Sequence, residues 1–292
     1  MSRLSIGVLR ELEGRTVMPS IKQAFLRVCP ESLIKTALRA IRKDRILRYR
    51  IDLALHRKEK SVFCPCCGVR FRSFNGGNYQ DNPSRFNPER YKHTSQDVLC
   101  PICRALPRHR ILALWCEEHI EELRSSEILY FAPEYSMIQW MDRNGVSFIT
   151  ADLYAEADLR LDIQETGFPD ESYDVIIANH VLEHVDDFRK ALQEMRRILR
   201  KGGVFICSFP MDQNIELLDE EAEPLSEAER IKRFGQNDHK RVFGMKADRF
   251  LTEAAFVVHV IDGADYPDEI LPVIGPADYD INRLFCCIKE GN

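Results

Sequence analysis

The sequence of 292 residues has no apolar run of about 18 residues, the length that a helix needs to cross a membrane. Its first residues lack the order of basic, apolar and small residues that marks a secretory signal. Internal repeats and low-complexity tracts are also missing. Together with 45% hydrophobic and 30% charged residues, these absences favour a cytoplasmic globular protein of one or two domains.

Charge is unevenly distributed along the chain. Residues 1–60 contain 15 Lys and Arg against 6 Asp and Glu, whereas the whole chain carries a net charge of −5. Between residues 20 and 58, apolar residues recur at three- and four-residue steps, which is typical of amphipathic helices. We therefore expect residues 1–60 to form a basic helical arm. Packing on the acidic remainder is the favoured role, and contact with an anionic surface is the alternative.

Ten cysteines in a cytoplasmic chain favour a metal site or buried thiols over disulfides. Two C-x-x-C pairs stand out, Cys64 with Cys67 and Cys100 with Cys103, separated by 32 residues. Four thiolates at about 2.3 Å suit a tetrahedral zinc ion, and such a closed site is structural. The alternative, four free cysteines in a loop, leaves their clustering unexplained. Residues 61–108 show little hydrophobic periodicity, so they need a cross-link or a structural metal to be stable. We therefore predict a zinc-knuckle module there.

Strand and helix patterns alternate from residue 109 onward. Strands that alternate with helices of roughly 10–15 residues indicate a parallel sheet, whose ligands lie beyond the carboxyl ends of the strands. The expected order is helix 110–123, strand 127–132, helix 134–144, strand 147–151, strand 172–178, helix 185–200, strand 203–209, a polar insertion at 211–240, helix 246–255, strand 256–262 and strand 283–289. Acids, an Asn and a His stand at the expected strand ends: Asp152, Asp162, Asn179 and His180.

The block Phe168-Pro-Asp-Glu-Ser-Tyr-Asp-Val-Ile-Ile-Ala-Asn-His-Val-Leu-Glu-His-Val185, with the turn Arg197-Ile-Leu-Arg-Lys-Gly-Gly203, resembles class I S-adenosylmethionine-dependent methyltransferases. The cysteine pairs followed by Leu106-Pro-Arg-His-Arg110 are similar to a bacterial subgroup of the methyltransferase type-11 group that carries an N-terminal zinc knuckle. The resemblance implies a doubly wound, mostly parallel, seven-stranded Rossmann-like α/β sheet over residues 109–292. It also implies S-adenosylmethionine as cofactor, beside the structural Zn²⁺.

The resemblance also assigns cofactor roles. Asp152 would bind the ribose hydroxyls, Asp162 the adenine amine, and Asn179 would lie near the reacting methyl group. Where the wider family has a glycine-rich loop, this chain has Ala132, Pro133 and Glu134, and no glycine. Glu134 would accept a hydrogen bond from the ammonium group of the cofactor, or would favour the dipole of the following helix. His109 would be a site residue, or a histidine at a helix start packed on the knuckle.

The acceptor side is expected in the polar stretch Phe234-Gly-Gln-Asn-Asp-His-Lys-Arg-Val-Phe-Gly244, which is similar to a run in the same subgroup. His239 is the candidate base, Asp238 would orient it, and Arg241 would bind an anionic acceptor. A solvated loop is the alternative. His180 is a further candidate beside the reacting atoms. His184 follows it at the spacing of a metal pair, but no third ligand has matching spacing, so we expect histidines packed on the sheet.

Three functions agree with these patterns. The favoured one is a methyltransferase for a small-molecule or glycan acceptor. The second is an RNA methyltransferase that uses the knuckle and the arm, with aromatic stacking and phosphate contacts by Phe71, Phe74, Tyr79 and Tyr91 among Arg70, Arg72, Arg85, Arg90 and Lys92. The third is a scaffold protein without catalytic activity. The absence of glycine from the cofactor loop is the reason to retain this alternative.

Overall fold

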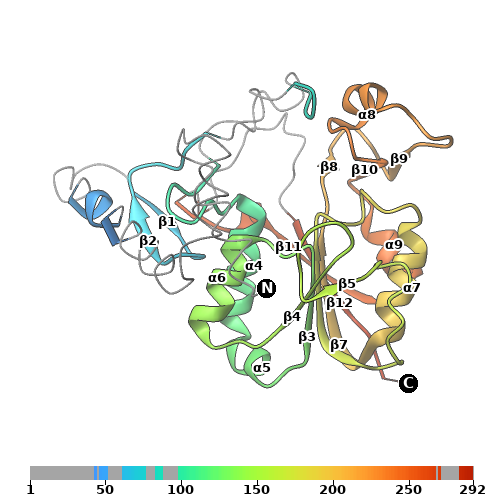
Figure 1. Cartoon of the computed structure of the whole chain (residues 1–292), viewed down its shortest axis with the longest axis horizontal. Helices are drawn as coiled ribbons and strands as arrows, with labels where there is room; N and C mark the ends of the chain where they lie inside the picture. Colours follow the sequence, from blue (N-terminus) through green and yellow to red (C-terminus); the bar gives the residue numbers. More distant parts are fainter. Residues whose placement is uncertain are drawn as a thin grey trace, which may run out of the picture.

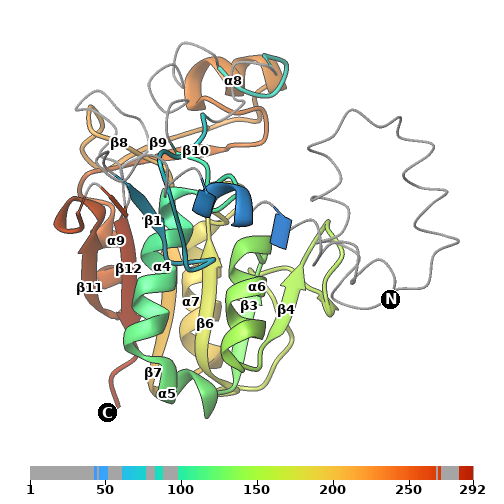
Figure 2. The same cartoon turned by 90° about the vertical axis from the view of Figure 1, so that its left-hand side faces the viewer.

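Figures 1 and 2 show a computed structural model that describes residues 43, 44, 46–51, 61–76, 83–87, 98–267, 269–270 and 283–291. Most of the predicted basic arm, as well as Tyr79, Arg90, Tyr91 and Lys92, lies outside the described residues. Within the described ranges, no helix has the length and apolar character that a membrane span requires.

The body of the molecule is a seven-stranded sheet in the order β11-β12-β7-β6-β3-β4-β5. Its parallel part consists of β3 (Ile128–Phe131), β4 (Ile149–Asp152), β5 (Leu159–Arg160), β6 (Tyr173–Asn179) and β7 (Leu199–Ser208). Strand β12 (Arg283–Ile288) pairs antiparallel with β7 and with β11 (Val257–Asp262). This topology confirms the predicted doubly wound, mostly parallel, Rossmann-like sheet.

The central strand β6 explains how one apolar run builds two cores. Successive side chains of a strand point to opposite faces of the sheet. Val175 and Ile177 therefore join one buried cluster, while Ile176 and Ala178 join the other. A strand buried on both faces reads as a continuous apolar run, which is why this segment was recognisable in the sequence.

Helices cover both faces of the sheet. On one face lie α4 (Pro107–Glu118), α5 (Ile120–Arg124) and α6 (Tyr135–Asn144), and on the other lie α7 (Phe188–Ile198) and α9 (Asp248–Glu253). Figure 2 shows α4 and α6 in front of the sheet and α7 behind it. The predicted start of α7 at residue 185 was wrong. Asp187 caps the helix by accepting from the backbone amides of Arg189 and Lys190, so residues 180–186 form turns instead.

The cysteine pairs belong to the buried cluster that also contains residues of α4 and α6. The first pair belongs to a small antiparallel hairpin of β1 (Val62–Cys64) and β2 (Val69–Phe71). Phe71 and Phe74 are buried in the apolar cluster that contains α4, so the expected stacking of these two rings on RNA bases was wrong. The hairpin therefore shares its core with the body of the protein.

The polar insertion forms a second, smaller sheet that the sequence patterns missed. Its strands are β8 (Met211–Asp212), β9 (Leu218–Glu220) and β10 (Arg241–Gly244), in the order β8-β10-β9, with α8 (Glu227–Phe234) between β9 and β10. A short helix η1 (Gly263–Asp265) follows β11. Strands of two to four residues are too short to show a periodicity. In Figure 1 the insertion sits above the carboxyl ends of the parallel strands.

Candidate cofactor and metal sites

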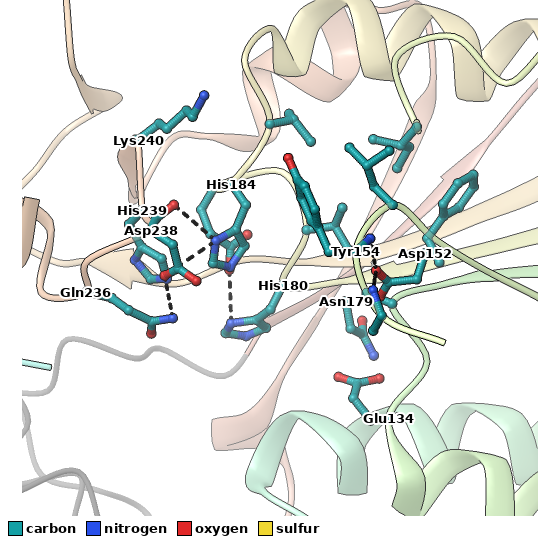
Figure 3. A pocket seen from close by; sticks show the side chains of 18 of the residues that line it. Glu134, Asp152, Tyr154, Asn179, His180, His184, Gln236, Asp238, His239 and Lys240 are labelled. Atoms are coloured by element: carbon teal, nitrogen blue, oxygen red, sulfur yellow. Dashed lines mark hydrogen bonds and ion pairs between the residues drawn. The ribbon is translucent and has the colours of Figure 1, made fainter. Parts of the chain in front are cut away.

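One cavity of about 1000 Å³ opens at the carboxyl ends of β3, β4 and β6, beneath the insertion (Figure 3). It brings together the side chains that the sequence predicted for cofactor binding and catalysis. Its lining includes Ala132, Pro133, Glu134, Asp152, Asp162, Asn179, His180, Asp238 and His239. These residues come from the ends of β3, β4 and β6, from the segment after β5, and from the loop before β10. The topology of the sheet therefore creates a single site from segments that are far apart in the chain.

Two residues at this cavity have backbone conformations that usually favour glycine. Ala132, directly after β3, has a φ of 44°, and His180, directly after β6, has a φ of 52°. Positive φ is uncommon for residues other than glycine and concentrates at ligand sites. The loop without glycine thus still adopts a glycine-like turn, with alanine as the smallest side chain that carries a Cβ.

Glu134 is held by three neighbours at the floor of the cavity. The Tyr130 hydroxyl donates to its Oε2, the His109 Nε2 lies 3.1 Å from its Oε1, and the Arg108 Nε lies 3.6 Å from the same oxygen. Burial alone would raise the pKa of the Glu134 carboxyl, but the combined effect of His109, Arg108 and Tyr130 lowers it. The carboxylate is therefore charged and fixed in orientation.

His109 connects the cysteine-containing segment to the cavity. Its Nδ1 accepts from the Leu106 backbone amide at 3.1 Å, which leaves the proton on Nε2 to donate to Glu134. Burial lowers the pKa of the His109 imidazole, so the ring is neutral near pH 7. Sequence reasoning left His109 either at the site or on the knuckle. The structure places it at the start of α4, in contact with Glu134.

The two predicted aspartates shape their own turns. The Asp152 Oδ1 accepts from the backbone amides of Tyr154 and Ala155, both at 2.7 Å. The Asp162 Oδ1 accepts from the backbone amide of Gln164 at 2.8 Å. In each turn backbone amides orient the carboxylate while its residue lines the cavity.

Asn179 ends β6 with its side chain buried at the cavity wall. Its Oδ1 accepts from the Ser208 hydroxyl at 3.0 Å, which directs the amide nitrogen elsewhere. Among the described residues, no hydrogen-bond acceptor reaches this Nδ2, although the atom is buried. A buried donor without a partner costs about 1–3 kcal/mol, so the site is suited to a ligand that supplies an acceptor.

A cluster of titratable residues lies at the end of the cavity nearest the insertion (Figure 3). The Glu183 side chain is fully buried, and its Oε1 lies 3.3 Å from the His180 Nδ1 and 3.8 Å from the His184 Nε2. The rings of His184 and His239 meet edge to face, with centroids 4.8 Å apart. Sequence reasoning missed Glu183, because nothing in its own segment shows that His239 folds back against it.

Asp238 lies against His184. Its backbone carbonyl oxygen is 3.2 Å from the His184 Nδ1, and its Oδ1 is 3.7 Å from the same nitrogen. Burial would raise the pKa of the Asp238 carboxyl, yet His184, Gln236 and His239 together lower it. Whether Asp238 also orients His239 during a reaction stays a prediction.

The expected anion-binding role of Arg241 was wrong. Its guanidinium is 1% exposed and donates to the backbone carbonyls of Leu182, Val185 and Asp186 and to the Glu220 carboxylate. These contacts occupy the guanidinium N–H groups that would otherwise bind an anionic methyl acceptor. Arg241 instead fastens the 182–186 loop to the insertion.

The four predicted zinc ligands converge in one buried cluster. The Sγ atoms of Cys64 and Cys103 are 3.7 Å apart, and those of Cys67 and Cys100 are 3.8 Å apart. Tetrahedral coordination at about 2.3 Å places ligand sulfurs roughly 3.8 Å apart, so a zinc ion fits. The backbone amides of Ile102 and Cys103 point at the Cys100 Sγ, at 3.4 and 3.5 Å. Cys66 instead donates to the His109 carbonyl.

A buried cation beside the cysteines supports a negatively charged cluster. The Arg110 side chain is 0% exposed, stacks 3.9 Å from the Phe74 ring centroid, and leaves Nε and Nη2 without hydrogen-bond partners among the described residues. Burial lowers the pKa of Arg110, whereas negative charge on Cys64, Cys66, Cys100 and Cys103 would raise it. Four thiolates around Zn²⁺ carry a net negative charge and would compensate the guanidinium.

Residues 134–207 match the family described as the methyltransferase domain. The match runs from Glu134 to Cys207, so it includes Asp152, Asp162 and Asn179. It excludes the cysteine pairs and His239, which this comparison therefore leaves untested.

Curated relatives match short segments of this chain. A probable S-adenosylmethionine-dependent methyltransferase of Mycolicibacterium smegmatis is 40% identical over 58 residues, which are 20% of this chain and 23% of that protein. The reducing polyketide synthase Preu2 of Preussia isomera is 38% identical over 55 residues, which are 19% of this chain and 2% of that protein. The chain thus covers less than a quarter of the length of either relative.

Among solved structures, the Burkholderia thailandensis 1,6-didemethyltoxoflavin-N1-methyltransferase with bound S-adenosylhomocysteine is 13% identical with a TM-score of 0.42, covering 63% of this chain and 84% of that chain. A SAM-dependent methyltransferase from Archaeoglobus fulgidus gives the same identity and TM-score, with coverage of 63% and 94%.

Proposed function

We propose that this protein is a cytoplasmic S-adenosylmethionine-dependent methyltransferase with a structural zinc ion, acting on a small-molecule or glycan acceptor. The observation that carries the proposal is the buried, unpartnered Nδ2 of Asn179 within a cavity that also collects Asp152 and Asp162. All three residues lie inside the segment that matches the methyltransferase domain family. The cavity of about 1000 Å³ is of the size that small-molecule sites have.

Each residue of the cavity has a defined task in this proposal. Asp152 accepts from the ribose hydroxyls, Asp162 accepts from the adenine amine, and Asn179 donates to the amino-acid part of the cofactor. Glu134 attracts the ammonium group, and Ala132 and Pro133 let the backbone approach it closely. The cofactor itself supplies a methyl group on a sulfonium sulfur.

At the acceptor end, the protein has to position a nucleophile in line with the methyl group and remove a proton where needed. His239 and His180 face this end of the cavity, with Asp238 beside them. We propose His239 as the base for an oxygen or nitrogen acceptor, Asp238 as the residue that orients the imidazoles, and His180 as a contact to the acceptor.

The surroundings of the cavity support a small-molecule or glycan acceptor. Phe71 and Phe74 are buried and unavailable for base stacking, which weakens the RNA alternative. A small molecule or glycan fits a cavity of this size that residues of the insertion partly line. The zinc ion would be structural, because its four cysteines complete a tetrahedral shell and leave no open position.

The test is calorimetric titration of the purified protein with S-adenosylhomocysteine. We expect binding by the wild type and a loss of about tenfold or more in affinity for Asp152→Ala, because two hydrogen bonds to a carboxylate disappear. The matched control is Asp265→Ala, an exposed aspartate outside the cavity, which should bind like the wild type.

Binding by the wild type should be followed by an acceptor screen with labelled methyl donor. If the wild type fails to bind at millimolar ligand, the enzyme proposal is wrong and the scaffold function takes its place. A steep salt dependence of RNA binding would instead favour the RNA methyltransferase.

A further inference from the structure

Glu183, His184 and His239 form a second group of metal-ligating side chains outside the cysteine cluster. One ligand atom from each lies within 4.8 Å of the others. The first two residues follow β6 in the chain, whereas His239 comes from the loop before β10. The insertion therefore supplies His239, whereas His180, which the sequence spacing paired with His184, is not part of this group.

The orientation of His184 suits ligation. Its Nδ1 faces the Asp238 backbone carbonyl at 3.2 Å, so this nitrogen donates its proton there. The other nitrogen, Nε2, then holds a lone pair and lies 3.8 Å from the Glu183 Oε1. Ligating histidines characteristically donate the second ring N–H to a carbonyl or carboxylate. Asp238 has this supporting position.

The charge of the cluster also favours a cation. Glu183 is fully buried beside three imidazoles. A buried carboxylate is costly unless it is paired or coordinates a metal. A divalent ion would balance it.

The backbone that presents these ligands is fixed. Arg241 binds the carbonyls of Leu182, Val185 and Asp186, and the Lys240 amide donates to the Glu183 carbonyl at 2.9 Å. These contacts tie the 182–186 loop to the segment that carries His239. The two halves of the cluster are therefore held together before any ion arrives, as an effective metal site requires.

We propose that Glu183, His184 and His239 bind a divalent transition-metal ion at the acceptor end of the cavity. Two imidazoles and one carboxylate form the ligand set of open metal sites, in which further positions remain for water or substrate. Since all three residues line the cavity, these open positions face the space proposed for the acceptor. This site differs from the cysteine cluster, whose four thiolates leave no position open.

The chemical consequence rests on the proposed methyltransferase function. A Lewis acid beside the acceptor lowers the pKa of a hydroxyl, so the favoured acceptors carry hydroxyl groups, as sugars and phenols do. During transfer the acceptor oxygen forms a bond to the methyl carbon, the carbon–sulfur bond breaks with its electrons remaining on sulfur, and the hydroxyl proton passes to solvent. If the metal ion is bound, His239 acts as its ligand, in place of the role of base that the methyltransferase proposal gives to it.

Metal binding is measured without methyl donor or acceptor. Protein whose cysteine cluster is filled with zinc would be titrated with MnCl₂, with free Mn²⁺ followed by electron paramagnetic resonance. A parallel titration with ZnCl₂ would be followed by elemental analysis. Mn²⁺ is a suitable probe because carboxylate oxygen suits it better than thiolate sulfur does, so it discriminates against the cysteine cluster. We expect one ion per chain beyond the zinc of the cysteine cluster.

Three variants test the assignment. His239→Asn and Glu183→Gln should each lose the additional ion, while His259→Asn, which alters an exposed histidine on β11 outside the cavity, should keep it. Thermal unfolding of each variant would show that the fold is intact, and His184→Asn serves if Glu183→Gln fails to fold.

If the wild type binds no additional ion, or if His239→Asn binds it as the wild type does, the inference is overturned. Glu183, His184 and His239 would then form a hydrogen-bonded cluster without a metal. The failures of the two proposals are distinguishable. Binding of S-adenosylhomocysteine without the second ion contradicts the metal site alone. Binding of the ion without S-adenosylhomocysteine contradicts the methyltransferase proposal alone.

Discussion

Ala132 and His180 show how the site departs from ordinary backbone preferences at the scale of single residues. Both follow a parallel strand directly, and both have positive φ. Such conformations cost of order 1–3 kcal/mol and persist where the surrounding structure imposes them. Here β3 and β6 are neighbours in the sheet, so the two turns enter the same cavity. The backbone strain therefore lies at the ends of the strands whose following residues line the proposed cofactor site.

His239→Ala is the prediction for a single residue at the acceptor end. We expect turnover on the acceptor found by screening to fall by about 10²–10⁴-fold, while affinity for S-adenosylhomocysteine stays nearly unchanged. The buried ring packs against His184 at the acceptor end of the cavity, which is the reason for this split. Wild-type turnover in the variant would exclude both roles proposed for His239, that of the base and that of a metal ligand. Turnover of the wild type that is lost with a chelator and restored by Mn²⁺ would favour ligation over base catalysis.

At the scale of elements, Glu194 ties α7 to the segment between β5 and β6. Its Oε1 accepts from the Thr166 amide at 2.9 Å and hydroxyl at 2.6 Å, and its Oε2 accepts from the Arg197 Nε at 2.8 Å. The hydrogen bonds with Arg197, assisted by those with Thr166, lower the pKa of the Glu194 carboxyl to about 2, from an ordinary value of 4.5. The carboxylate stabilises the fold as long as it is charged.

We therefore expect Glu194→Gln to lower the free energy of unfolding by about 1–3 kcal/mol at pH 7. Because the folded pKa lies below the unfolded one, this contribution is complete above pH 4.5 and disappears as the pH falls towards 2. Thermal unfolding of wild type and variant across this range measures the difference. The control Glu253→Gln removes a pair with Arg249 at 3.7 Å, in which both side chains are 61% exposed, and should cost less than about 0.5 kcal/mol. Equal losses of unfolding free energy in both variants would contradict the proposed stabilising role of Glu194.

At the scale of the whole molecule, the cysteine cluster joins the β1–β2 hairpin to the body of the protein. Its residues share one apolar cluster with α4, α6 and β3. The hairpin has two strands of three residues each, too little to be stable alone. Zinc would therefore stabilise the attachment of this segment rather than the sheet.

We predict one tightly bound zinc per chain at these cysteines, measured by elemental analysis. Cys100→Ser/Cys103→Ser should lose it, and hydrogen exchange should accelerate in residues 61–76 and 98–106 much more than in β6 and β7. Cys66→Ala is the matched control and should retain the metal, because the Cys66 thiol donates to the His109 carbonyl instead. Zinc retained in the double variant would disprove the ligand assignment.

The sequence by itself determined features that depend on neighbours in the chain. The two C-x-x-C pairs specified the cysteine cluster, and the apolar run of β6 specified a central strand. Acids placed directly after strands anticipated the cavity, because parallel strands bring their carboxyl ends to one edge. Each of these inferences needs a local pattern and one general rule of sheet topology.

The tertiary structure alone decided the rest. His184 and Asp238 are 54 residues apart in sequence, yet they are in contact, and the same fold brings His239 to Glu183. Arg241 resembles a surface anion binder in the sequence, but the insertion buries it against three carbonyls. Phe71 and Phe74 lie in a polar segment and still enter the core beside α4. Contacts of this kind depend on which surfaces pack together, and that choice is made by the free energy of the whole fold rather than by any local segment.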